Sequence, residues 1–283
     1  PYRLALPCVK RTSKDRLNRS PHSLLQRCQI LKLQRLALAR GLSVAVDYEY
    51  RAVPLFMQAA RLLQAGAVGT PWLVKLDWLM GSRADPQRGW NWYAQADQGG
   101  GVIGALGTHA VDMLAWLIGP LGAVQALNGV SIKQRPHPDG GLAAVDAPDV
   151  SLLQTVAHWQ GRQDLPVPAQ VSLSSVSRNG RGFCLDVVGS SGSLLLSSTN
   201  QKDYVHGFEL QHAALGEPFR AVEADADFAF PETWADGRIA PVLRVLGWWA
   251  ESIRSGQPML PGLAEGVASR VACDQTQTSL AHN

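Results

Sequence analysis

The sequence predicts an α+β fold: a mostly antiparallel, open sheet covered on one face by helices. Short strand-like segments separated by turn residues follow one another from residue 124 to about 198, and helical patterns lie on both sides of them. Among the 283 residues, 46% are hydrophobic and 17% are charged, which is typical of a globular protein. The sequence contains no apolar run of the roughly 18 residues that a membrane helix needs.

The first half predicts two strands and up to three helices. A weakly periodic stretch at 24–38 is compatible with one helix, and the apolar run 42–46 after Gly41 predicts a buried strand. Pro54 stands where a first-turn proline belongs, so a helix is expected from there to Leu63, ending at Gly66. A strand at 72–79 and a helix at 102–118 follow.

The second half predicts the rest of the sheet and two closing helices. Residues 169–174 alternate between apolar and polar, so one face of that strand is expected to be buried and the other polar. Gly189 and Gly192 interrupt an apolar stretch and predict a hairpin. Helices are expected at 238–253 and from 263 to about 276.

Charge is distributed unevenly along the chain. The first 40 residues hold ten Lys and Arg against one acid, Asp15, although the net charge of the whole chain is only +3. A nucleic-acid arm, a transit peptide, and a truncated or misread N-terminus are three possible accounts. We favour the third, because neither stacking aromatics nor a cleavage context accompanies the charge. We therefore expect no nucleic-acid partner and no membrane partner.

The four cysteines lie far apart and show no metal-ligand spacing. They are Cys8, Cys28, Cys184 and Cys273. This pattern favours reduced thiols in a cytoplasmic protein and predicts neither a disulfide framework nor a metal site.

The stretch Gly99–Gly104 satisfies the pattern G-x-G-x-x-G of dinucleotide-binding turns. Its context does not fit, because no apolar strand precedes it and no acidic residue follows about 20 positions later. We expect these glycines to let the backbone approach a ligand, or to pack a helix start closely against a neighbour.

His109 and Asp112 are three residues apart and would share a face of the helix that follows these glycines. His109 could act as a general base or hydrogen-bond partner for a substrate hydroxyl, with Asp112 fixing its tautomer or binding the substrate. The alternative is a half-buried structural histidine beside a structural carboxylate, and the spacing by itself favours that alternative.

The stretch from Gly99 to Asp112, followed by Trp116–Gly119, resembles the GGG-x-L-x-x-x-G-x-H-x-x-D…WL-x-G signature of the Gfo/Idh/MocA family of NAD(P)-dependent oxidoreductases. Further matches occur in the family's order across residues 41–278. They are Val46–Arg51 with Pro54, Gly66–Gly69, Trp90–Trp92 and Gly189–Leu194.

The resemblance implies an N-terminal Rossmann domain that binds NAD or NADP, and a C-terminal domain that binds substrate and pairs subunits into a homo-dimer or tetramer through its open sheet. Residues 1–46 would then be a remnant or an aberrant end of the first domain, and residues 47–283 the second. No phosphate-binding turn or Glu-Lys-Pro motif occurs in the first 40 residues. We therefore assign no cofactor-binding residue.

The resemblance also implies roles for four residues. His109 would be the catalytic acid/base, and Asp112, Trp92 and Arg51 would lie near a sugar or polyol substrate, although Arg51 and Asp112 could equally be structural. Many members carry Asp or Asn four residues before the histidine, whereas this chain has Ala105.

Two hypotheses remain open. The chain is a truncated oxidoreductase of this family, or it is a non-catalytic substrate-binding or dimerisation module. In either case we expect that this polypeptide alone neither binds NAD(P)H nor turns over substrate.

Overall fold

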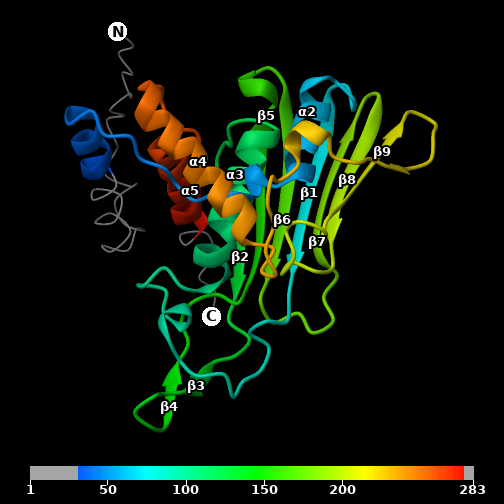
Figure 1. The fold of residues 1–283 in the computed structure, drawn as a ribbon. Coiled ribbons are helices and arrows are strands. Elements are labelled where there is room, and N and C mark those ends of the chain that lie inside the picture. The colour runs from blue at the N-terminus through cyan, green and yellow to red at the C-terminus, as the bar shows by residue number, and fades with distance from the viewer. Residues whose placement is uncertain (1–30, 277–283) are drawn as a thin grey trace.

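The computed structural model describes residues 31–276, which form a large sheet, a small ribbon and a layer of helices (Figure 1). The sheet contains β1 (Pro71–Leu79), β2 (Gln125–Gly129), β5 (Val150–His158), β6 (Pro166–Ser174), β7 (Gly182–Gly189), β8 (Gly192–Ser198), β9 (Glu209–Ala214) and β10 (Arg220–Ala221). Its strand order is β10-β9-β8-β7-β1-β6-β5-β2, so β10 and β2 are open edges. Only β1 and β6 pair in parallel; the other neighbours in this sheet are antiparallel.

The helices gather on one face of this sheet. They are α2 (Pro54–Gln64), α3 (Thr108–Leu117), α4 (Ile239–Ser255) and α5 (Leu263–Thr276), together with a helix at residues 31–39. Helix α2 packs against β8 and β9, and α5 packs against β2 and α3. The short helix η2 (Glu49–Ala52) lies between α4, α2 and α3. This arrangement confirms the predicted fold class.

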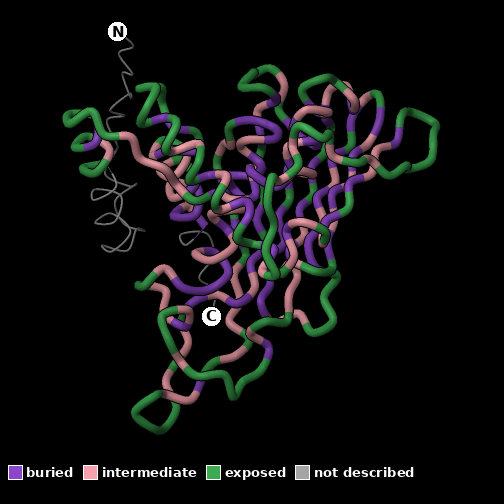
Figure 2. Tube along the Cα trace, viewed as in Figure 1, coloured by how far each residue is buried: buried purple, intermediate pink, exposed green. Residues whose placement is uncertain are grey.

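The core lies between the helices and the sheet. Val74, Leu76 and Trp78 of β1 point inward and are at most 2% exposed. In register with them, Val187, Leu185 and Phe183 of β7 are fully buried. Buried residues accordingly run along the strands, whereas the loops at both ends are exposed (Figure 2).

Most predicted elements are confirmed, and two predictions were wrong. Residues 42–46 do not form a strand: Ala45 makes only an isolated bridge with Gly262, because no neighbouring strand of the described chain offers a ladder. The second face of β6 is not uniformly solvated, since Ser172 and Ser174 are buried. Residues 24–30 of the predicted first helix lie outside the described residues.

The strands β9 and β10, a small ribbon and a π-helical turn were not predicted. The strands β3 (Gln134–Pro136) and β4 (Leu142–Ala144) form a separate ribbon beyond the end of the sheet (Figure 1). The helix expected at 102–118 begins with a π-helical turn, η4 (Ile103–Gly107), before α3. Within residues 31–276, no helix has both the length and the apolarity needed to cross a bilayer.

The glycine run packs against the protein's own backbone. A side chain on Gly100 would collide with the carbonyl oxygens of Trp92 and Tyr93, and one on Gly101 with that of Pro148. The amides of Gly100 and Val102 already donate to the carbonyls of Gln95 and Pro148, at 2.9 and 2.8 Å. These amides are not free to bind phosphate, so the run is a tight helix start and not a dinucleotide-binding turn.

A buried ion pair fixes η2 against α3. Arg51 donates from Nε to Oδ2 and from Nη2 to Oδ1 of Asp112, at 2.8 and 2.6 Å. The two side chains are only 12% and 3% exposed. Such a bidentate pair fixes the relative position of the two elements, because losing either partner leaves a buried charge uncompensated.

We expect Gly101→Ala to destabilise the fold more than Gly99→Ala. Both residues have positive φ, +71° and +73°, which costs an alanine about 1–2 kcal/mol. Only Gly101 also meets backbone atoms at close range, whereas the nearest atom to an alanine side chain at position 99 is Arg270 Nη1 at 4.0 Å. Urea unfolding of the two variants measures the difference, and equal losses would contradict the close packing.

We expect Asp112→Ala to lower the free energy of unfolding by about 3–5 kcal/mol, because Arg51 would remain buried without its partner. The control is Glu251→Ala, which breaks the exposed Arg254–Glu251 pair on α4 and should cost less than about 1 kcal/mol. The double variant Asp112→Leu with Arg51→Met removes both buried charges together and should therefore cost less than Asp112→Ala. Urea unfolding that shows equal losses for Asp112→Ala and Glu251→Ala would contradict this role of the pair.

Candidate functional site

The candidate site lies where η2 faces α3. His109 and Asp112 share one face of α3, as their spacing predicted, and that face is turned toward η2. Asp112 is bound by Arg51, and His109 Nδ1 lies 3.7 Å from Glu49 Oε2. Two residues of η2 therefore partner two residues of α3, one pair beside the other.

His109 is enclosed by aromatic rings. The edges of Tyr48 and Tyr50 pack against its imidazole, with ring centroids 5.7 and 5.5 Å away. Burial lowers the pKa of His109 to about 4, because a charged imidazolium would lose its hydration there. The imidazole is therefore neutral at pH 7.

The two ring nitrogens of His109 differ in their surroundings. Nδ1 is buried and has no hydrogen-bond partner among the described residues. Nε2 does not belong to the buried side-chain atoms that lack a partner. The side chain as a whole is 24% exposed. Nε2 is thus the nitrogen that a ligand could reach.

Glu49 is a buried carboxyl group beside this ring. Its side chain is 14% exposed, and burial raises its pKa to about 7, with smaller contributions from the negative charges of Asp47 and Asp112. A hydrogen bond to its own backbone opposes the shift. Glu49 therefore changes its charge near neutral pH, next to a histidine that stays neutral.

A pair of tyrosines forms the wall behind Glu49 and His109. The hydroxyls of Tyr50 and Tyr204 are 2.6 Å apart, and both side chains are buried. Burial raises the pKa of Tyr204 to about 12 and that of Tyr50 well above its usual value. Both phenols are therefore protonated at neutral pH and serve as neutral hydrogen-bonding groups.

The structure places the four predicted site residues in three settings. His109 lies at the rim of the site described above. Arg51 and Asp112 are bound to each other, and both carboxylate oxygens of Asp112 accept hydrogen bonds from Arg51. Trp92 lies in the short helix η3 (Trp92–Ala94), is 51% exposed and packs edge-to-face with Tyr93. A role in substrate binding for these residues stays a prediction.

Sequence reasoning missed Glu49, Tyr50 and Tyr204 as site residues. Glu49 lies 60 positions before His109 and Tyr204 lies 95 positions after it, so no local spacing links them. The sequence around 46–54 matched a family segment, but that match indicated no partner for the histidine.

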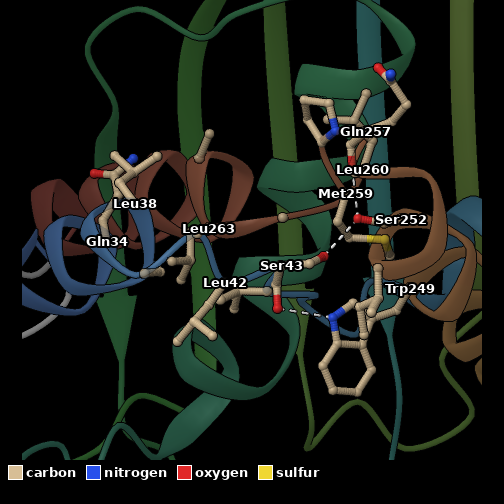
Figure 3. A pocket seen from close by; sticks show the side chains of 18 of the residues that line it. Gln34, Leu38, Leu42, Ser43, Trp249, Ser252, Gln257, Met259, Leu260 and Leu263 are labelled. Carbon is tan, nitrogen blue, oxygen red and sulfur yellow. Dashed lines mark hydrogen bonds between the residues drawn. The ribbon is translucent and has the colours of Figure 1, made fainter.

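A separate groove of about 710 Å³ lies between residues 34–44 and the helices α4 and α5 (Figure 3). Apolar side chains such as Leu38, Trp249, Met259 and Leu260 line it. Ser43 closes one side, since its hydroxyl meets that of Ser252 at 2.6 Å and its carbonyl accepts from Trp249 Nε1 at 3.1 Å. His109 does not line this groove, and most of the lining side chains are apolar.

The described residues do not fit two common cofactors. No group of three or more His, Cys, Asp or Glu side chains within residues 31–276 could hold a metal ion. The only stretch there with a dinucleotide-binding pattern is Gly99–Gly104, where the amides of Gly99, Gly100 and Val102 already donate to backbone carbonyls.

Two curated proteins resemble the chain in sequence. An uncharacterized oxidoreductase of Synechocystis sp. is 42% identical over 252 residues, which are 88% of this chain and 66% of that protein. The levoglucosan dehydrogenase of Pseudarthrobacter phenanthrenivorans is 31% identical over 101 residues, 35% of this chain and 26% of that protein. The chain thus spans less than two thirds of the length of each of these relatives.

Solved structures share the fold at lower identity. An NAD binding oxidoreductase from Klebsiella pneumoniae aligns with a TM-score of 0.75 at 18% identity, over 89% of this chain and 68% of its own. Levoglucosan dehydrogenase in complex with NADH and levoglucosan aligns with a TM-score of 0.70 at 22% identity, over 84% of this chain and 64% of its own.

The family model for the C-terminal alpha/beta domain of this oxidoreductase family matches residues 60–282, which is most of the chain. That range includes the end of α2, α3 with His109 and Asp112, the whole sheet and both closing helices. The chain therefore belongs to the Gfo/Idh/MocA oxidoreductase family, of which it contains the C-terminal α/β domain.

Proposed function

We propose that the chain supplies the substrate-binding and proton-transfer side of an NAD(P)-linked oxidoreductase that acts on a hydroxyl group of a sugar, polyol or related compound. The observation that carries this proposal is the neutral imidazole of His109, with its reachable Nε2 and a carboxyl group behind Nδ1. Relatives with this fold bind NADH together with levoglucosan or L-sorbose, and one binds NAD+ with L-tartaric acid.

His109 would accept the hydroxyl proton of the substrate at Nε2 as the alcohol becomes a carbonyl, and would return it in the reverse direction. The imidazolium formed in this way is costly in a buried site, but above about pH 7 the ionised Glu49 lies 3.7 Å from it and compensates the charge. Proton abstraction should therefore be favoured as the pH rises through about 7.

The nicotinamide cofactor is the partner that accepts or gives hydride when it is bound. We assign none of residues 31–276 to its phosphates, because the glycine run is closed by the protein's own carbonyls.

Ligand titration tests the proposed function. We expect levoglucosan, L-sorbose or L-tartrate to shift the ring resonances of His109 in NMR spectra of the chain, and the shifts of the other histidines to stay small. His109→Gln assigns the resonances and should weaken binding about tenfold, since one hydrogen bond to the substrate is lost. If all three ligands leave His109 unmoved, the proposed substrate class is wrong.

A second titration separates substrate binding from cofactor binding. We expect NADH to give no saturable change in fluorescence with this chain, because the amides of Gly99, Gly100 and Val102 in the glycine run already donate to the protein's own carbonyls. Saturable binding in the micromolar range would contradict this expectation and favour a chain that is a complete enzyme.

We further propose that the chain pairs with itself through the open face of the sheet. Apolar side chains on that face remain exposed on neighbouring strands: Leu127 of β2, Leu152 and Val156 of β5, Leu73 of β1 and Val188 of β7. Polar residues such as Lys75 and Gln170 lie between the two apolar groups. Such a mixed, solvent-facing sheet fits the composition of a subunit interface.

Leu152→Asp together with Leu127→Asp should convert the oligomer to a monomer, because the two side chains lie opposite each other in the β2–β5 register and would bury charge in the interface. Light scattering coupled to gel filtration measures the mass. The matched control is Leu215→Asp, which changes another exposed leucine, in the turn after β9, and should leave the mass unchanged. A wild-type monomer would contradict the proposal.

A further inference from the structure

The buried nitrogen Nδ1 of His109 and the carboxyl group of Glu49 face each other across η2 and α3. A neutral imidazole carries one proton, and the group near each nitrogen decides which of the two holds it. Nδ1 has no hydrogen bond in the described part of the chain, yet it faces a carboxyl oxygen 3.7 Å away. Distances of this kind commonly shorten when a ligand closes the site.

We propose that Glu49 is the positioning residue of His109: it holds the ring proton on Nδ1 and so leaves the lone pair of Nε2 free for the substrate hydroxyl. The inference extends the proposed function, because it gives the same histidine the tautomer that a general base requires. With the proton on Nε2 instead, the reachable nitrogen could donate but could not accept.

The other groups packed around His109 cannot take this role. Asp112, on the same helix, is held by both donors of Arg51. The hydroxyl of Tyr50 is paired with that of Tyr204, and the hydroxyl of Tyr48 is hydrogen-bonded to Ser269.

The helical turn before His109 offers no substitute for Glu49. Position 105 is an alanine, and the thiol of Cys273 in α5 contacts the carbonyl of Ile103. Among the described residues, Glu49 is the one whose carboxyl group lies within 4 Å of a ring nitrogen of His109. The carboxylate partner of the histidine therefore comes from η2, 60 positions away, and not from its own helix.

Burial of Glu49 makes the tautomer of His109 sensitive to pH. Below about pH 7 the carboxyl group is protonated and neutral, so it attracts the Nδ1 proton less than the carboxylate does. As the pH rises through 7, Glu49 ionises while His109 stays neutral, and the Nδ1–H tautomer should become predominant. The further charges that act on Glu49 are Asp47, which precedes η2 and is partly buried, and Asp112 of α3, which is bound by Arg51.

Nitrogen-15 NMR of the imidazole rings tests the proposal on the chain itself, without turnover, since protonated and unprotonated ring nitrogens resonate far apart. Well above pH 7 we expect His109 in the wild type to carry its proton predominantly on Nδ1. Glu49→Ala should make the Nε2–H tautomer predominant. Glu49→Gln, which keeps the shape, should abolish the inflection near pH 7 in the His109 resonances.

The matched control is Asp47→Asn, which removes a nearby carboxylate that has no ion pair with the ring. It should leave the tautomer well above pH 7 unchanged and keep the inflection, moved to lower pH because one negative charge near Glu49 is lost. Thermal unfolding of each variant identifies any that fail to fold. A wild type that carries the proton on Nε2, or a Glu49→Ala variant that keeps it on Nδ1, would overturn the proposal.

These outcomes are separate from a failure of the proposed function. If levoglucosan, L-sorbose and L-tartrate leave His109 unmoved, the substrate class is wrong, but the tautomer measurement still decides the role of Glu49. If a polyol binds while the ring proton is on Nε2, the substrate class stands, whereas the positioning role of Glu49 and proton acceptance at Nε2 both fall.

Discussion

The site depends on the ion pair between Arg51 and Asp112. Neither η2, with four residues, nor the turn that leads into it could hold a fixed position by its own backbone hydrogen bonds. Two hydrogen bonds from one guanidinium to one buried carboxylate fix the distance and the rotation of η2 against α3. With that contact in place, Glu49 faces His109 about one helical turn away. The Arg51–Asp112 pair therefore sets the geometry of the Glu49–His109 pair.

Burial then decides the charges of Glu49 and His109. The same loss of hydration lowers the pKa of His109 and raises that of Glu49, because each group is driven toward its neutral form. An exposed Glu–His pair would be ionised at both ends between their usual pKa values. Here both groups are neutral up to about pH 7. His109 and the adjacent carboxyl group of Glu49 can therefore be buried together without the cost of burying two charges.

The glycine run shows how a motif can be matched without its function. The letters of Gly99–Gly104 fit a phosphate-binding turn, but the run follows a loop, and its amides bond to carbonyls of that loop and of Pro148. The glycines are needed because backbone atoms approach where a side chain would stand. In the sequence, the lack of a preceding apolar strand and of a following acidic residue already indicated that this run does not bind a dinucleotide. The hydrogen bonds of its amides supply the physical reason.

The sequence by itself determined the fold class, α2, the β7–β8 hairpin and the two closing helices, because these depend on local periodicity and on punctuation by Pro54, Gly66 and Gly189. It also placed His109 and Asp112 on one helix face. It failed at residues 42–46, because an apolar run becomes a strand only where a neighbour pairs with it. Only the tertiary structure decided that Arg51 binds Asp112 and that Glu49 and Tyr50 lie against the histidine. Contacts between residues about 60 positions apart are set by packing and leave no periodic signal in the chain.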